Sequence, residues 1–311
     1  MAKSKGQQLK ELIDARDGLV MIGVFDGFSA RLVERMGYQS ALVSGAGLSE
    51  SRLGRPDVGI MDLTENVAGV KAIAACTDLL LIADGDTGYG NAVNVYFTVQ
   101  EFERAGAAGV MIEDQVWPKR CGHMAGKQVI PADEMVEKVH AAVEARRDKD
   151  FVIKARTDAA GPLGLDEAIR RANLYAEAGA DLVFADALLS EADVTRFVQS
   201  VNAPAAINMG FGIRRRATTP LMSVQALRSL HVAVIDVPRI LTSAAIRGMT
   251  NALAAFGESV QTGSVTDRPD LLVSFEELND LVGFGEIQEL ERRYSTEAQL
   301  TAQYGPRRAA A

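Results

Sequence analysis

The sequence predicts an α/β protein of the (β/α)8 barrel class, and three observations support this. Short apolar runs typical of strands alternate with helical segments about eight times, and such alternation implies a closed parallel barrel. A polar side chain ends nearly every strand: Asp26, Ser44, Asp84, Glu113, Arg156, Asp186 and Asn208. An open doubly wound sheet would require a glycine-rich phosphate-binding turn after the first strand, and Phe25-Asp26-Gly27 is not one.

The strands are identified as short apolar runs bounded by Gly, Asp, Asn or Ser. They are expected at 18–24, 40–43, 79–83, 109–112, 151–155, 181–185, 204–207 and 232–237. The helices are identified by apolar spacing, as in Val67, Val70 and Ile73, by starts such as Pro131 and by stops such as Gly106. They are expected at 29–36, 63–76, 95–105, 131–147, 166–178, 190–201 and 223–230, with a last one ending near 255.

The C-terminal part of the chain lies outside the barrel repeat. We assign residues 1–257 to the barrel and residues 258–311 to a linker, a further helix and a tail. The polar segment 256–270 contains glycines and a proline, which favours a linker. Residues 272–294 have helical apolar spacing, and residues 307–311 are expected to be disordered.

The composition is that of a globular protein that binds neither nucleic acid nor membranes. Of the 311 residues, 48% are hydrophobic, which is enough for a large core. A net charge of −8 and a pI near 5.1 argue against a general nucleic-acid binder. Residues 1–13 lack the apolar core of a signal peptide, and no segment is long enough to span a membrane. The cysteines, Cys76 and Cys121, show no disulfide or metal-binding pattern, so we expect a reducing, cytoplasmic location.

The most distinctive motif is Lys119-Arg120-Cys121-Gly122-His123. Neighbouring cations favour the thiolate form of a cysteine, which makes the thiol chemically useful near neutral pH. Gly122 and the later Gly126 allow this loop to move or to adopt unusual backbone dihedrals. The alternative is a solvated basic loop that happens to contain a cysteine. Cys76 follows a helical apolar pattern instead and is expected to be a core thiol.

Acidic residues follow two of the expected strands. Asp84 and Asp86 stand in the segment Asp-Gly-Asp-Thr-Gly-Tyr-Gly after one apolar run, and Glu113 follows another. The carboxyl ends of parallel strands meet at the face of a barrel where chemistry is assembled. Several carboxylates converging there require a compensating cation, and Mg²⁺ binds oxygen ligands of this type. The sequence therefore predicts a Mg²⁺ site at Asp84, Asp86 and Glu113, with Mn²⁺ as a possible substitute.

Together these motifs resemble the isocitrate lyase/phosphoenolpyruvate mutase superfamily. Within it they are most similar to the short lyases, namely 2-methylisocitrate lyase, 2,3-dimethylmalate lyase and oxaloacetate acetylhydrolase. The resemblance runs from about residue 20 to about residue 255. Further matching segments are 44–47 (Ser-Gly-Ala-Gly), 54–57 (Gly-Arg-Pro-Asp), 155–159 (Ala-Arg-Thr-Asp-Ala) and 219–221 (Thr-Pro-Leu). The cysteine loop is the most specific of these signals, because the mutases and phosphonopyruvate hydrolases of the superfamily lack it.

The resemblance implies a carbon–carbon lyase that acts on a small 2-hydroxy di- or tricarboxylate. Asp84 would hold Mg²⁺, and Asp86 and Glu113 would contact the waters of the metal. The substrate-binding residues would be Ser44, Gly45, Ala46, Asp57, Arg156, Asp186 and Asn208. The catalytic residues would be Cys121, Lys119, His123 and Arg156. Cys121 would protonate the carbanion left by a retro-aldol cleavage, acting as a general acid. For Arg156, the alternative is a structural ion pair with Asp158.

Three departures from the short lyases bear on the substrate. Several of them have a tyrosine where this chain has Leu42, which leaves the base unidentified. Tyr89 is a candidate only because of its proximity to the metal-binding acids. Methylisocitrate lyases have a glutamate where this chain has Asp186. The loop 209–218 contains Arg214, Arg215 and Arg216, which form either a solvated basic turn or a second carboxylate clamp.

Three other functions remain open from the sequence. These are an oxaloacetate hydrolase or decarboxylase, a phosphonate mutase or hydrolase, and a carboxylate-binding protein without catalytic activity. The resemblance also implies a homo-oligomer, and we expect a tetramer whose C-terminal helix is exchanged between subunits. The expected partners are a small carboxylate substrate and further copies of the chain.

Overall fold

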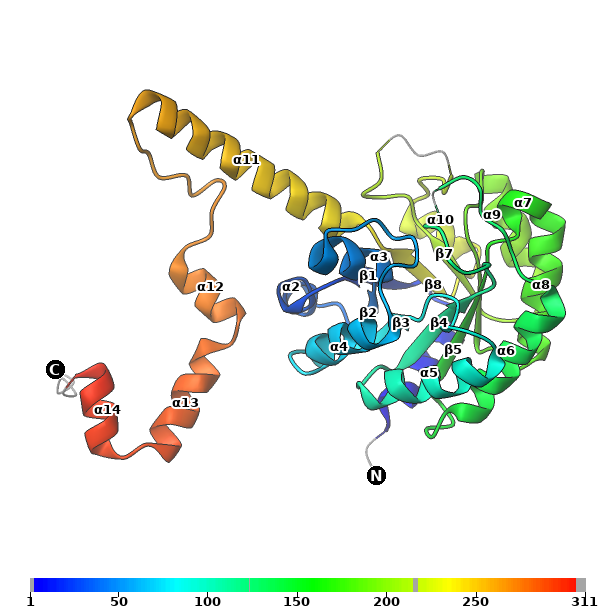
Figure 1. Ribbon diagram of the computed structural model, residues 1–311, viewed down its shortest axis with the longest axis horizontal. Coiled ribbons are helices and arrows are strands. Elements are labelled where there is room, and N and C mark those ends of the chain that lie inside the picture. The colour runs from blue at the N-terminus through cyan, green and yellow to red at the C-terminus, as the bar shows by residue number, and fades with distance from the viewer. Residues whose placement is uncertain (1–2, 123, 215–217, 306–311) are drawn as a thin grey trace. The chain divides into compact units, whose positions relative to one another are not determined.

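The computed structural model describes residues 3–122, 124–214 and 218–305, and it contains a closed barrel of eight parallel strands (Figure 1). The strands follow one another around the barrel in sequence order, and β1 closes it by pairing with β8. They are β1 (Leu19–Val24), β2 (Ser40–Val43), β3 (Leu80–Asp84), β4 (Gly109–Glu113), β5 (Val152–Thr157), β6 (Leu182–Ala185), β7 (Ala205–Asn208) and β8 (Val234–Val237). The predicted (β/α)8 fold is confirmed.

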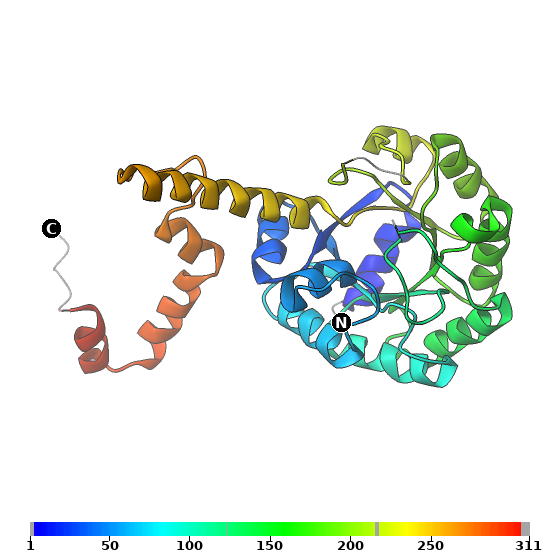
Figure 2. The same ribbon diagram turned by 45° about the horizontal axis from the view of Figure 1, so that its top comes forward.

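Helices form a ring around these strands, as the second view shows (Figure 2). Those that cover the barrel are α2 (Gly27–Arg35), α4 (Leu63–Ala74), α5 (Ala92–Arg104), α6 (Ala132–Ala145), α8 (Leu165–Glu177), α9 (Glu191–Ser200) and α10 (Val224–Ser229). A capping side chain just before a helix fixes where that helix begins. Asp26 and Asp62, for example, cap α2 and α4 by accepting hydrogen bonds from backbone N–H groups.

Short helices not expected from the sequence complete the barrel domain. They are α1 (Lys5–Asp14), α3 (Gly45–Leu48), a π-helix η1 (Ser49–Leu53) and α7 (Ala160–Leu163). Leu9 and Ile13 of α1 belong to a buried apolar cluster that includes inward-facing strand residues such as Ile82 and Phe184. This packing gives the barrel a solid interior, so that reactive polar groups are left at the carboxyl ends of the strands.

The C-terminal part differs from the expectation in two respects. The helix α11 (Ile240–Thr262) continues through residues 256–262, which we had predicted to be linker. The single helix predicted at 272–294 is replaced by α12 (Phe275–Leu281) and α13 (Phe284–Tyr294), followed by α14 (Glu297–Tyr304). Gly283 separates the first two because it adopts a left-handed conformation, with φ of 79°, that a continuing helix does not allow.

The chain divides into two compact units, 1–246 and 247–311. The boundary that we placed at 257 stays a prediction, as does the exchange of the C-terminal helix. The tail at 307–311 lies outside the described residues. Among the described residues, no helix is both long and apolar enough to cross a membrane.

Candidate active site

A small cavity lies at the carboxyl ends of the barrel strands. Its volume is about 50 Å³, and it is lined by residues that include Leu42, Ser44, Ala46, Asp57, Asp84, Cys121, Arg156, Asp186, Asn208, Asp236 and Arg239. Most of the residues predicted to bind substrate therefore meet at one place.

The cysteine loop lies directly over this cavity. Cys121 is buried, and its backbone N–H donates to the carbonyl oxygen of Asp57 at 3.0 Å. A Cβ atom added to Gly122 would lie 1.7 Å from Oδ2 of Asp186, so only glycine permits this close approach. Cys121 and Gly122 thus place this loop, and its thiol, at the cavity. His123, a predicted catalytic residue, lies outside the described residues.

Arg239 is a residue of this site that the sequence did not indicate. Its Nη2 donates to the Sγ of Cys121 at 3.3 Å, while its Nη1 bonds both carboxylate oxygens of Glu50, at 2.7 and 2.6 Å. Burial disfavours the charged guanidinium, but Cys121 and Glu50 outweigh it and raise the pKa of Arg239. A fixed positive charge therefore faces the thiol.

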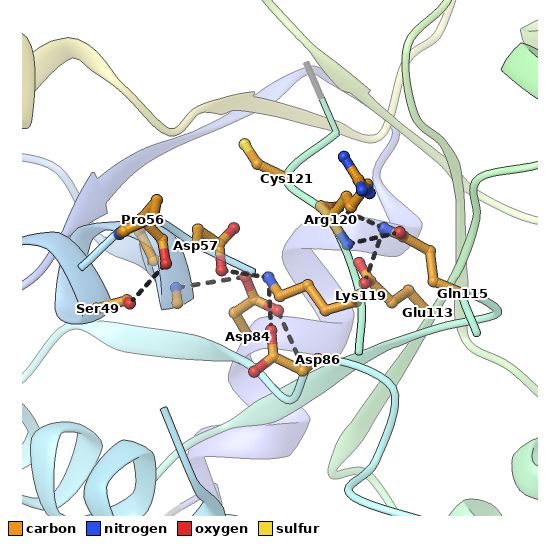
Figure 3. A network of polar contacts seen from close by, with 12 residues as sticks. Ser49, Pro56, Asp57, Asp84, Asp86, Glu113, Gln115, Lys119, Arg120 and Cys121 are labelled. Carbon is orange, nitrogen blue, oxygen red and sulfur yellow. Dashed lines mark hydrogen bonds and ion pairs between the residues drawn. The ribbon is translucent and has the colours of Figure 1, made fainter. Parts of the chain in front are cut away.

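Lys119 joins the predicted metal loop to the predicted substrate loop. Its Nζ lies between the carboxylates of Asp57 and Asp86, at 2.7 Å from Oδ1 of Asp86, as Figure 3 shows. Burial opposes its charge, but Asp86, Glu113 and Asp57 together raise the pKa of Lys119 well above its ordinary value. Lys119 is therefore a permanent cation, suited to neutralising carboxylates and not to releasing a proton.

Asp84 presents its carboxylate to the cavity at the end of β3. Its Oδ2 accepts from the backbone N–H of Gly45 at 3.3 Å, and its Oδ1 accepts from that of Asp86 at 3.2 Å. A Cβ on residue 45 would lie 2.8 Å from Oδ2 of Asp84, so glycine is required for this approach. Ser44 uses its own Oγ to cap α3. The Ser44–Ala46 segment thus contacts Asp84 through the backbone N–H of Gly45, and the predicted binding of substrate by this segment stays a prediction.

Among the described residues in and next to the cavity, buried carboxylates outnumber buried cations. The buried carboxylates belong to Asp57, Asp84, Asp86, Glu113, Asp158, Asp186 and Asp236, and the buried cations to Lys119, Lys127, Lys154 and Arg156. Burial raises the pKa of Asp86 to about 6, despite the opposing charge of Lys119. Burial likewise raises the pKa of Glu113 well above its ordinary value. This excess of negative charge is what a divalent cation would relieve.

The three predicted metal ligands do not gather around one point. In the described ranges, no group of three or more His, Cys, Asp or Glu side chains is arranged to hold a metal ion. Glu113 instead lies 3.2 Å from Nε of Arg156 and accepts from Gln115. A site with one direct carboxylate fits these residues, because Mg²⁺ commonly keeps several waters and takes one or two protein carboxylates.

Arg156 is held by carboxylates on two sides. Its Nε and Nη2 donate to the two oxygens of Asp158 at 2.8 and 2.9 Å, and Nη2 also donates to Oδ2 of Asp186 at 3.1 Å. The structural ion pair with Asp158 that we weighed against a clamp is thus present, although Arg156 also lines the cavity. Asp186 further accepts from Lys127 and from Asn208.

Asp114 is a further buried carboxylate, and it supports the ion pair between Arg156 and Asp158. Oδ2 of Asp114 accepts from Thr157 and Tyr175 and pairs with Arg171, while its Oδ1 accepts from the backbone N–H of Asp158 at 2.8 Å. Asp114 therefore holds the backbone at Thr157 and Asp158 in place, and Asp158 in turn holds Arg156. Asp114 directly follows Glu113, and the sequence does not reveal that Glu113 faces Arg156 whereas Asp114 pairs with Arg171.

The remaining sequence-based candidates have separate outcomes. Leu42 lines the cavity and offers no group for proton transfer. The hydroxyl of Tyr89 donates to Asp86 and accepts from Asn66, and burial followed by Asp86 raises the pKa of Tyr89 well above its ordinary value. Arg214 is exposed, and it is absent from the described lining of the cavity. Arg215 and Arg216 lie outside the described residues.

Comparison with known proteins identifies the family. The family model described as phosphoenolpyruvate phosphomutase matches residues 9–256. The chain belongs to the phosphoenolpyruvate mutase family, within the isocitrate lyase superfamily. It is 39% identical over 289 residues to 2,3-dimethylmalate lyase of Eubacterium barkeri, covering 93% of this chain and 98% of that one. It is also 39% identical over 295 residues to 2-methylisocitrate lyase of Aeropyrum pernix, covering 94% and 92%.

Solved structures of the superfamily share the whole fold. Oxaloacetate acetylhydrolase in complex with 3,3-difluorooxalacetate superposes with a TM-score of 0.87 at 30% identity, covering 95% of this chain and 98% of that one. Phosphonopyruvate hydrolase in complex with oxalate and Mg²⁺ superposes with a TM-score of 0.81 at 29% identity, covering 94% and 100%. The expected superfamily membership is confirmed, as is the expectation of an enzyme of the carbon–carbon lyase type.

Proposed function

We propose that this enzyme is a Mg²⁺-dependent lyase that cleaves a 2-hydroxy di- or tricarboxylate of the 2-methylisocitrate or 2,3-dimethylmalate type. The products are a 2-oxo acid and a second carboxylate. The observation that carries the proposal is the convergence of Cys121, Asp84 and Arg156 on one cavity. The two lyase relatives, each aligned over more than nine tenths of this chain, support the reaction class.

Asp84 would hold the metal directly, with Asp86 and Glu113 reached through water. When bound, Mg²⁺ would stabilise negative charge on the substrate oxygens. The Ser44–Ala46 segment lies beside Asp84 and the ammonium of Lys119 beside Asp86, so they would orient the carboxylate and hydroxyl ends of the substrate. The solved structure of phosphonopyruvate hydrolase in complex with oxalate and Mg²⁺ supports the use of Mg²⁺ and a small carboxylate ligand by this fold.

The guanidinium of Arg156 lies between Asp158 and Asp186. It would also donate hydrogen bonds to a second carboxylate of the substrate. Breaking the C2–C3 bond leaves an enolate on the departing half. The thiol of Cys121 would give its proton to the carbon of that enolate, acting as a general acid. Arg239 then faces the thiolate that remains, at 3.3 Å. A loop closed over the bound substrate would keep bulk water from protonating the enolate first.

One assay tests the proposal. The protein is incubated with Mg²⁺ and, separately, 2-methylisocitrate, isocitrate, 2,3-dimethylmalate and oxaloacetate, and the formation of 2-oxo acid and carboxylate products is followed. Cleavage of one of the 2-hydroxy acids is expected. Turnover of none of the four would contradict the proposal.

Hydrolysis of oxaloacetate is the second candidate, and the structural match to oxaloacetate acetylhydrolase favours it. In the same assay, this activity would appear as oxalate and acetate formed from oxaloacetate, with the 2-hydroxy acids untouched. Both reactions break a carbon–carbon bond, so the products and not the metal requirement separate them.

A further inference from the structure

Asp236 is a buried carboxylate of this cavity to which the proposed mechanism gives no task. It lies at the carboxyl end of β8, its relative exposure is 1%, and it lines the cavity beside Asp84 and Cys121. Its Oδ2 is paired with Nζ of Lys154, whereas its Oδ1 has no hydrogen-bond partner among the described residues. A buried oxygen without a donor is unfavourable unless a bound molecule supplies one.

The pairing with Lys154 crosses the interior of the barrel. Lys154 lies on β5, two residues before Arg156, and its side chain is completely buried. Its Nζ lies 5.0 Å from the ring centre of Phe184, and Arg156 packs against the same ring one layer nearer to the cavity. Buried charges persist when they are paired, so Lys154 holds Asp236 in one orientation. Only the second oxygen of Asp236 is left to meet a ligand.

Cleavage of a 2-hydroxy acid requires a group that takes the hydroxyl proton, and the other candidates are poorly placed for this. Leu42 has no basic atom, and Lys119 remains protonated between its acids. The hydroxyl of Tyr89 is engaged by Asp86 and Asn66 and does not line the cavity. Both oxygens of Asp186 already accept hydrogen bonds from Arg156, Lys127 or Asn208.

We propose that Oδ1 of Asp236 is the acceptor for the substrate's hydroxyl group, first of its hydrogen bond and then of its proton. The inference rests on the proposed lyase function and names a residue that this function requires. Lys154 is the positioning residue that keeps the carboxylate in place.

The step balances as follows. The hydroxyl O–H bond breaks and its proton moves to Oδ1, while the oxygen electron pair forms the carbonyl of the 2-oxo acid. The C2–C3 bond breaks, and its electron pair remains on the departing half as an enolate. That enolate takes the proton of Cys121. Asp236 ends with one proton more and Cys121 with one fewer, and exchange with solvent after product release restores both.

Two variants test this assignment. Asp236→Asn removes the charge but leaves the Lys154 ammonium buried and unpaired, which can prevent folding. The double variant Lys154→Met/Asp236→Asn removes both charges and avoids that penalty. Arg146→Met/Asp181→Asn is the matched control, because it removes an ion pair of 2.7 Å at the opposite end of the strands. Thermal melts establish that each variant is folded.

The first measurement is binding, which does not depend on turnover. Calorimetry with Mg²⁺ compares malate, which has a hydroxyl, with succinate, which lacks it. The parent and the control should bind malate roughly tenfold more tightly or better, the scale of one hydrogen bond to a charged group. The Lys154→Met/Asp236→Asn variant should lose this preference. A parent without the preference would mean that Oδ1 holds only water, and the inference would be overturned.

The second measurement is turnover of the best acid in the substrate assay. Loss by about 10²-fold or more is expected for the folded double variant and not for the control, as for removal of a general base. A folded variant with parental turnover would overturn the assignment. If the parent cleaves no acid at all but shows a malate preference that the variant loses, the lyase proposal fails while Asp236 stands as the hydroxyl acceptor.

Discussion

The guanidinium of Arg239 donates a hydrogen bond to the Sγ of Cys121 across 3.3 Å. Arg239 directly follows Pro238 after β8, whereas Cys121 stands in the loop after β4, so closure of the barrel brings them together. Glu50 of the π-helix η1 fixes the other side of the guanidinium. A cation so placed stabilises a thiolate more than a thiol.

Replacing Arg239 should therefore slow the chemistry of Cys121. We expect Arg239→Met to reduce the rate of iodoacetamide alkylation roughly tenfold or more, since a hydrogen bond to a charged group is worth about that much. The measurement is made at neutral pH in a Cys76→Ser background, so that alkylation occurs at Cys121 alone. Arg170→Met is the control, because Arg170 is an exposed residue on α8 that pairs with Glu167. Equal rates in Arg239→Met and its parent would show that Arg239 does not activate the thiol.

Activity should require a divalent metal held by Asp84. We expect excess EDTA to abolish turnover and Mg²⁺ to restore it. Asp84→Asn should lose roughly 10²-fold or more, because a metal that stabilises oxygen charge contributes several kcal/mol. Asp78→Asn is the control, since Asp78 is exposed at the opposite end of the same strand. Full turnover in EDTA would remove the metal from the mechanism.

The loop from 116 to 129 should open to admit substrate. The cavity is small, about 50 Å³, and Cys121 and Gly122 of this loop line it, so we expect the loop to move when a di- or tricarboxylate enters. The expected result is that Mg²⁺ with an unreactive dicarboxylate slows both alkylation of Cys121 and trypsin cleavage after Arg120. One closure covers both positions, so both rates should fall together. If saturating analogue changes neither rate, the loop is not a lid.

The chain should form a homo-oligomer, and we predict a tetramer. Met249, Leu253, Phe256 and Val260 recur at helical spacing on α11 and are exposed by 59–72% within one chain. An apolar face of this kind requires a partner surface. Sedimentation should show the oligomer for the parent and for Asn251→Glu, which changes the opposite face of the helix, and a smaller species for Phe256→Glu. A parent that is monomeric at micromolar concentration would rule this prediction out.

Sequence periodicity was sufficient to predict the barrel, because strand and helix patterns are local properties of the chain. The strand-end positions of Asp84, Arg156 and Asp186 followed from that fold. Arg239 could not be predicted in the same way, because its contact with Cys121 joins residues 118 positions apart and depends on barrel closure.

The Lys154–Asp236 pair was missed for a related reason, since its members are 82 positions apart. One signal was available. Asp236 is the single charged residue of β8, and Lys154 follows a run of apolar residues at the start of β5; charged residues are rarely buried unless they are paired. The division of the predicted helix at 272–294 into α12 and α13 was missed because apolar spacing alone does not reveal the left-handed turn at Gly283.

The most direct test of the lyase mechanism is the fate of solvent hydrogen during cleavage. The reaction is run in D₂O with the best 2-hydroxy acid, and the carboxylate product is analysed by mass spectrometry and NMR. We predict one deuterium, in a single configuration, at the carbon that was attached to the hydroxyl-bearing carbon. Cys121→Ser should be slower by about 10²-fold or more, and Cys76→Ser should match the parent. Deuterium in both configurations, or undiminished turnover by Cys121→Ser, would contradict protonation of an enolate by Cys121.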